Sequence, residues 1–87
     1  MNFGQAIEAA YQGKKVARQG WNGKGMFVFL VPGSSFKVSR APLLGHFPNG
    51  TEIVYRPHLD MKYADGTVGV WMASHSDMLE ADWMIVE

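Results

Sequence analysis

The first apolar pattern along this chain has helical spacing. Its members lie three or four residues apart and form one stripe of a helix: Phe3, Ala6, Ile7, Ala10 and Tyr11. Asn2 precedes the stripe and can cap the first turn. Gly13 follows it, at the position where glycine commonly ends a helix. The pattern predicts a helix over residues 2–12.

Short β-type patterns follow this helix. Residues 16–18 are a short strand candidate with alternating faces, and residues 26–31 are apolar throughout. The second run predicts a central strand covered on both faces, which Pro32 and Gly33 bring to an end. Residues 20–25 between the two runs have the composition of a loop.

The middle of the chain gives weaker patterns. Around Phe36 and Val38 the alternation with polar residues predicts a short strand, and a long excursion rich in Pro, Gly and Asn then runs to residue 50. An irregular segment of this length in a small domain is often functional. Residues 51–56 alternate again and end at Pro57, which predicts a short edge strand.

The last third of the chain predicts a hairpin, a helix and a strand. An Asp-Gly pair within residues 64–66 separates two alternating runs, the usual signature of a β-hairpin. Residues 76–82 predict a short helix with Ser74 or Ser76 as its cap and Leu79 paired to Trp83 at helical spacing. Residues 84–86 predict a terminal strand. The expected fold is α+β: one domain over residues 1–87, with a small antiparallel sheet, an N-terminal helix and a short C-terminal helix.

Composition adds an expectation of self-association. A chain of 87 residues buries only roughly 60–65% of the surface exposed by its unfolded form. Yet 47% of the residues are hydrophobic, including eleven aromatics and six Met. This is more than one small core readily encloses, so we expect part of it to lie in a subunit interface or a ligand pocket.

Charge and cysteine content exclude several classes of function. Eight Lys and Arg balance eight Asp and Glu, which argues against binding to polymeric nucleic acid but not against a small anion. The absence of Cys excludes disulfides and fits a cytoplasmic location. The N-terminus lacks the pattern of a signal peptide. The longest apolar run is far shorter than the ~20 residues that span a bilayer, so we expect no membrane association.

The loop around Trp21 is the first candidate binding site. Glycine lets main-chain amides approach a ligand, and an indole offers a flat face with one donor, so Trp21, Asn22 and Gly23 suit a planar polar ligand. Trp21 lacks the periodic partners expected of a core residue. The alternative is a structural role, in which the Trp21 ring packs at the rim of the sheet and the loop is only a turn. Arg18 and Lys24 lie on either side of the loop. The guanidinium of Arg18 can bind a phosphate through two hydrogen bonds, whereas Lys24 can equally be a solvated surface charge.

Further candidates lie later in the chain. Tyr55 and Arg56 form a polar-aromatic cluster beside a histidine, although an ordinary edge strand with surface charge explains them equally well. Trp71 and Ser74 follow the predicted hairpin, where Trp71 can also belong to the sheet core. Asp77 fits a helix-terminal carboxylate better than a ribose ligand.

No arrangement of residues predicts catalysis or metal binding. The three histidines are widely separated and form no metal-ligand spacing. Ser, His and Asp occur together within residues 74–77, but adjacent side chains point in different directions and do not form a triad. We expect no catalytic residue, metal or cofactor.

Two long segments carry a resemblance to a known family. They are FGQAIEAAYQGKKVARQGWNGKGMFVFLVPGSSF and PHLDMKYADGTVGVWMASHSDMLEADWMIV. Together they resemble the Thoeris anti-defence type 2-like domain of phages and prophages, over nearly the whole chain. The specific signal is the order and spacing of GKKVAR, GWNGKGM, LVPGSSF, PHLDMK and SDMLEADW.

The resemblance implies a function. Members of that family are described as non-enzymatic sponges that bind a cyclic ADP-ribose isomer or related cyclic nucleotides, as homotetramers with pockets between subunits. The resemblance therefore implies a protein that sequesters an immune signal in the host cytoplasm. A small oligomeric protein-interaction module without a nucleotide ligand remains the alternative, and a small hydrolase fits the residues least.

Overall fold

The computed structural model describes residues 1–21 and 25–87, and its first element is helix α1 (Phe3–Tyr11). Asn2 is the N-cap: its side chain accepts from Gln5 N at 2.8 Å, and the Gln5 side chain accepts from Asn2 N at 2.9 Å. This reciprocal pair satisfies amides that have no partner inside the helix. Gly13 follows with φ of 85°, a conformation that glycine adopts without strain. The predicted helix and both of its ends are confirmed.

The main sheet is antiparallel. Its strands are β1 (Lys15–Arg18), β2 (Phe27–Val31), β5 (His58–Lys62), β6 (Val68–Val70) and β7 (Trp83–Val86). Their order in the sheet is β6-β5-β2-β1-β7, so β2 is central, as predicted. The predicted Asp-Gly hairpin joins β5 to β6, with Gly66 at φ of 90° and Asp65 Oδ1 accepting from Thr67 N at 2.9 Å. The predicted α+β class is confirmed.

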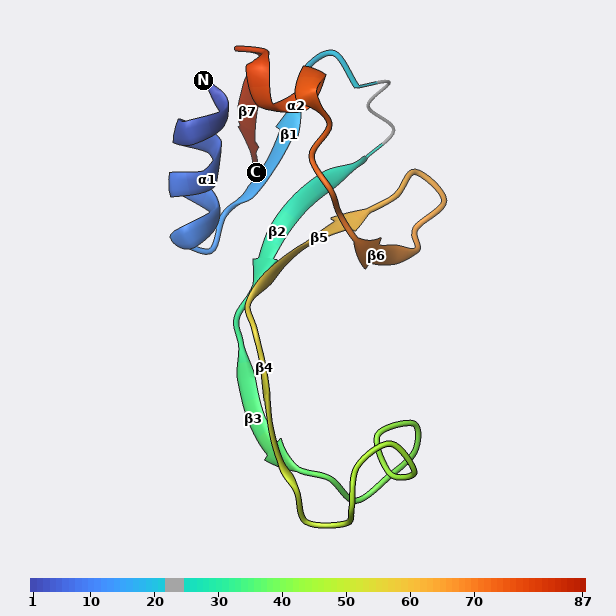
Figure 1. The fold of residues 1–87 in the computed structure, drawn as a ribbon. Helices are drawn as coiled ribbons and strands as arrows, with labels where there is room; N and C mark the ends of the chain where they lie inside the picture. Colours follow the sequence, from blue (N-terminus) through green and yellow to red (C-terminus); the bar gives the residue numbers. More distant parts are fainter. Residues whose placement is uncertain (22–24) are drawn as a thin grey trace.

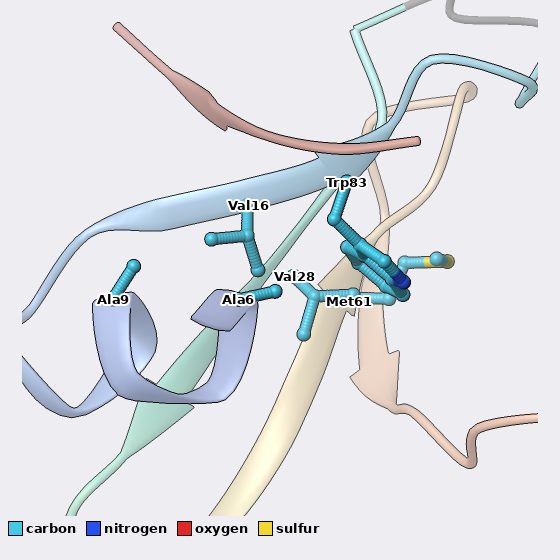
Figure 2. Packing of buried hydrophobic residues seen from close by; sticks show 6 residues of the cluster. All are labelled: Ala6, Ala9, Val16, Val28, Met61 and Trp83. Atoms are coloured by element: carbon cyan, nitrogen blue, oxygen red, sulfur yellow. The ribbon is translucent and has the colours of Figure 1, made fainter. Parts of the chain in front are cut away.

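The core lies between α1 and one face of this sheet (Figure 2). Register pairs Val16 with Val28 and Val28 with Met61, which places the three side chains on the same face. Most of the buried side chains are alanines and valines, so the core is thin. The buried cluster shown in Figure 2 consists of Ala6, Ala9, Val16, Val28, Met61 and Trp83.

The other face of the sheet is only partly buried, and here one prediction is wrong. We expected both faces of β2 to be buried, but within this strand only Val28 is buried. Neighbouring residues on a strand point to opposite faces, so Phe27 and Phe29 lie opposite the core, where antiparallel sheets often face water. We call this side the open face; it carries Lys15, Phe27, Phe29, Lys62, Val68, Val70 and Met84.

Strands β3 (Ser34–Lys37) and β4 (Glu52–Tyr55) form a separate two-stranded sheet. Figure 1 shows that they continue the β2–β5 ribbon away from the rest of the molecule and end in the long excursion predicted from the sequence. We call residues 34–55 the arm. The molecule measures 46 × 26 × 25 Å and has a radius of gyration of 15.9 Å, against about 12 Å for a compact chain of this length. The arm accounts for this elongation.

Helix α2 (His75–Leu79) is shorter than the helix predicted over residues 76–82. Ser74 is its N-cap, one of the two predicted caps. Trp83 belongs to β7, so its predicted helical pairing with Leu79 is wrong. Leu79 is 83% exposed, whereas Trp83 is 2% exposed. Pairing with β1 draws Trp83 into the core and prevents the helix from continuing. Neither helix of the described chain is long and apolar enough to cross a membrane.

Candidate ligand-binding site

Three charged side chains from distant parts of the chain meet beside α2. Arg18, the last residue of β1, donates from Nε to Asp82 Oδ1 and from Nη1 to Asp77 Oδ1, each at 2.9 Å. Their side chains are 15%, 27% and 13% exposed for Arg18, Asp82 and Asp77. Because partial burial limits screening by water, these pairs are stronger than ordinary surface salt bridges. Arg18 thus ties β1 to α2 and to the segment that enters β7.

Asp77 also organises α2. Its Oδ2 accepts from Ser74 N and its own N–H donates to Ser74 Oγ, both at 3.1 Å, which completes a capping box. Its backbone carbonyl accepts from Trp83 Nε1 at 2.8 Å. The interpretation of Asp77 as a helix-terminal carboxylate is confirmed, and these contacts hold its carboxylate in one orientation.

Trp21 lies in an aromatic cluster beside this network. Its Nε1 donates to Asp77 Oδ1 at 3.2 Å. Its ring meets Trp71 edge-on at 6.2 Å between centroids and Trp83 at 5.3 Å, separations that aromatic pairs favour. Trp21 is partly buried against the core, so the expectation that it lacks core partners is wrong. The periodicity of the sequence does not reveal these partners, because it reports contacts within one element and the partners lie on other elements.

The backbone at Gly20 approaches the same network. Gly20 N donates to Asp82 Oδ2 at 2.8 Å. A Cβ at this position would lie 2.7 Å from that oxygen, closer than real contacts allow. The glycine therefore lets the chain after β1 pass directly over the carboxylate, and this fixes where the loop after Trp21 begins.

The network shifts the pKa values of its members. Burial raises the pKa of Asp77, but hydrogen bonds from Arg18, Ser74 and Trp21 outweigh burial and lower it below its ordinary value. The hydrogen bond from Arg18 is the main cause that lowers the pKa of Asp82. In return, hydrogen bonds to Asp82 and then Asp77 raise the pKa of Arg18. All three groups therefore stay charged at neutral pH.

Half of the predicted contact residues converge on this cluster. Trp71 joins through its contact with the Trp21 ring, and Ser74 joins through the capping box. Asn22, Gly23 and Lys24 lie outside the described residues. The predicted residues that come together are Arg18, Trp21, Trp71, Ser74 and Asp77.

Tyr55 and Arg56 lie elsewhere: Tyr55 is the last residue of β4 in the arm, and Arg56 follows it. The Tyr55 ring packs on Phe36 of the neighbouring strand, with centroids 5.4 Å apart. Tyr55 also lines a hollow of about 330 Å³ in the arm, together with Phe36, Lys37 and Arg40. The structure thus separates the predicted residues that it describes into a cluster beside α2 and a pair where β4 ends.

Asp82 is the principal residue that sequence reasoning missed. The register places Trp83 opposite Arg18 in the β1–β7 ladder, which brings the preceding residue to the Arg18 side chain. The pairing of β1 with β7 would have revealed this contact. The helix predicted over residues 76–82 concealed it, because a helical Asp82 would point elsewhere.

The polar side chains of this cluster are held in place by hydrogen bonds to one another and to the backbone. No buried side-chain nitrogen or oxygen in the described part of the chain lacks a hydrogen-bond partner. Among residues 1–21 and 25–87, no three His, Asp or Glu side chains are grouped as metal ligands would be. The arrangement holds the Trp21 indole and the Arg18 guanidinium in defined positions beside the loop.

Comparison with known proteins gives the family. A family model described as the Thoeris anti-defense 2-like domain matches residues 1–86. The chain belongs to the Thoeris anti-defense 2-like family. It is 38% identical over 86 residues to Thoeris anti-defense 2 of Bacillus phage SP01, an alignment that covers 99% of this chain and 94% of the relative. The resemblance carried by the sequence motifs is confirmed, and the fold described above is that of an anti-defence family.

Proposed function

We propose that this chain binds a cyclic ADP-ribose-type immune signal and holds it without degrading it, which would block Thoeris immunity in the bacterial host cytoplasm. The observation that carries the proposal is the family match over residues 1–86. The relative from Bacillus phage SP01 is named for the same anti-defence role. Cyclic oligonucleotides share the base, ribose and phosphate groups of such a signal and are further candidate ligands.

The aromatic cluster suits the base of this ligand. A stacked adenine contributes roughly 1–3 kcal/mol on an aromatic face, and Trp21 and Trp71 meet edge-on at the cluster, with Asp77 fixing the Trp21 indole. Pyrophosphate requires cations or convergent amides, and ribose hydroxyls require polar oxygens. In this proposal phosphate and ribose contacts come from Arg18, Asn22, Gly23, Lys24, Ser74 and Asp77.

The proposed protein is a homo-oligomer, with a tetramer as the expected form. A thin core leaves large apolar side chains exposed on the arm, including Val54 at 69%. A lone two-stranded hairpin is marginally stable in water, so packing against another copy would stabilise the arm. If the arm of one copy reaches the Trp21 cluster of the next, Tyr55 and Arg56 would complete a pocket between subunits.

Calorimetry against a panel of cyclic ADP-ribose isomers and cyclic oligonucleotides tests the proposal. A sponge must compete with the receptor, so we expect nanomolar or tighter binding of at least one compound, roughly −12 kcal/mol. Trp21→Ala should weaken that binding at least about tenfold, through lost stacking. Tyr11→Ala removes an aromatic ring that is 71% exposed on α1, and it should leave the affinity unchanged.

Two results would contradict the proposal. No heat with any compound, from a protein that melts cooperatively, would favour an interaction module without a nucleotide ligand. If the Trp21→Ala variant and the parent protein bind with equal affinity, the cluster around Trp21 is not part of the binding site. Thermal melting of each variant separates a loss of binding from a loss of fold.

A further inference from the structure

The open face contains a hollow that the function proposed above does not use. It encloses about 400 Å³, and its lining is mostly apolar. This volume falls within the roughly 300–1,000 Å³ typical of small-molecule sites. The side chains that matter for its chemistry are Lys15, Phe27, Phe29, Leu30, Lys62 and Val68.

Two lysines converge on one aromatic ring in this hollow. Lys15 on β1 and Lys62 on β5 flank the central strand β2, whose Phe27 lies between them. The Lys15 Nζ is 4.9 Å from the Phe27 ring centroid, and the Lys62 Nζ is 5.6 Å from it. Contact with a ring face stabilises each cation only weakly at exposed sites, while the two like charges repel each other.

Neither ammonium group is neutralised within the described part of the chain. The salt bridges of the described residues join Arg18 to Asp77 and Asp82, and neither lysine takes part in them. Asp60 is the next residue of β5 on the open face; its carboxylate lies 3.2 Å from His58 Nε2 and forms no salt bridge with Lys62. Lys62 Nζ donates to the neutral carbonyl of Gly25, at 3.3 Å. The hollow therefore combines two ammonium groups, neither of which contacts a carboxylate of the described residues, with an aromatic floor.

We propose that this hollow is a second binding site, for a small phosphate-bearing molecule with a planar ring, the class to which nucleoside diphosphates belong. A diphosphate placed between Lys15 and Lys62 offsets their mutual repulsion and accepts charge-assisted hydrogen bonds from both. As the ammonium groups move onto phosphate oxygens, the face of Phe27 becomes available to a base. Phe29, whose ring centroid is 5.9 Å from that of Phe27, extends the apolar floor.

The site is distinct from the Trp21 cluster. Lys15 and Lys62 lie on the open face, whereas Arg18 shares the α1 side of the sheet with Val16, which is two residues before it on β1. The test uses ADP instead of a cyclic immune signal, so its outcome is independent of the function proposed above.

Titration of the ¹⁵N-labelled protein with ADP locates the ligand. We expect the amide resonances of Gly13, Phe27, Gly66 and Val68, which line the hollow, to shift together and to saturate. Adenosine supplies the planar base without the phosphates, and inorganic pyrophosphate supplies the phosphates without a base. Each should therefore bind more weakly than ADP. The absence of shifts at all four residues in millimolar ADP, or shifts confined to the Trp21 cluster, would overturn the proposal.

Charge removal provides the second measurement. Lys15→Gln and Lys62→Gln should each weaken ADP binding about tenfold, as expected for the loss of one charge-assisted hydrogen bond. Lys14→Gln removes the neighbouring charge, which does not line the hollow, and should leave the affinity within about twofold. Equal affinities in all three variants would show that the paired lysines do not recognise the phosphate, and the assignment would fail.

Discussion

A single carboxylate, that of Asp77, connects a strand, a helix and an indole. It accepts hydrogen bonds from Arg18 on β1, from the Trp21 ring and from the Ser74 amide at the start of α2. Removing its charge would leave the partly buried guanidinium of Arg18 with Asp82 as its remaining ionic partner. The carboxylate therefore positions Trp21 as well as stabilising the fold.

Asp77→Asn should lower the free energy of unfolding by about 1–3 kcal/mol, because hydrogen bonds to a charged acceptor become hydrogen bonds to a neutral one. Urea denaturation at neutral pH measures the change. Glu8→Gln also removes one negative charge, but from an exposed position on α1, and should change stability by less than about 0.5 kcal/mol. Equal effects of the two substitutions would show that the network adds nothing beyond net charge.

The same network predicts how stability depends on pH. The folded-state pKa values of Asp77 and Asp82 are lowered, whereas an unfolded Asp titrates near about 3.9. The unfolded chain therefore binds protons first as the pH falls, so this stabilisation is complete above about pH 5 and is lost as the pH drops through the lowered pKa values. Asp65, whose pKa is lowered by the Thr67 hydroxyl, contributes with the same sign.

Scanning calorimetry from neutral pH down to about pH 2.5 should therefore show Tm falling below about pH 4. Asp77→Asn should make this fall shallower, since one of the titrating groups is gone. A Tm that is constant or rises in this acid range would contradict the account, as would an identical slope in the variant.

At this scale the sequence predicted residue types well and their contacts poorly. Arg18, Trp21 and Asp77 were singled out by side-chain chemistry, and the structure brings them together. Asp82 was missed because its contact depends on the β1–β7 register, which local patterns do not contain. Lys15 and Lys62 were missed for the same reason, as their convergence on Phe27 depends on the pairing of both strands with β2.

Among the elements, those with strong local signals were predicted correctly. Helix α1 has a clear stripe and two caps, and the β5–β6 hairpin has its Asp-Gly turn. The predicted end of α2 was wrong, since a nonlocal ladder with β1 begins at Trp83. The apolar run in β2 predicts burial on both faces, which is wrong because only Val28 of this strand is buried and the opposite apolar face is left partly open.

The connection from β1 to the Trp21 loop gives a prediction at this scale. Gly20→Ala should destabilise the protein by about 1–2 kcal/mol, because a Cβ would push Asp82 away from the Gly20 amide. Gly4→Ala, inside α1, meets only an ordinary contact at 3.4 Å and should stabilise by up to about 1 kcal/mol. Thermal melts that show the same sign for both substitutions would contradict this assignment.

The whole molecule is a small body with a projecting arm. Its buried core is a small cluster of alanines and valines with Met61 and Trp83, and apolar side chains remain on the open face and on the arm, such as Val70 at 65% exposure. Composition predicted surplus apolar surface, and the structure shows where it lies. Whether another copy covers it depends on contacts between chains, which no pattern within one chain specifies.

Self-association through the arm is expected to depend on Val54. Val54→Glu places a charge on an exposed apolar position of β4 and should shift the oligomer to monomers or dimers at micromolar concentration, since burial of an unpaired charge is strongly unfavourable. Gln12→Glu adds the same charge at the exposed end of α1 and should leave the assembly unchanged. Sedimentation velocity measures both. A parent protein that is only monomeric at this concentration would contradict the interfacial pocket.

The central claim is that the protein holds its ligand intact, and one measurement tests it most directly. The purified protein is incubated with the cyclic ADP-ribose signal made by a TIR-domain enzyme, unbound ligand is removed, and the complex is denatured by heat. Mass spectrometry then identifies what is released. The account predicts unmodified cyclic signal in a fixed ratio to protein. Recovery of linear ADP-ribose would show an enzyme, and recovery of no nucleotide would show that the chain does not bind the signal.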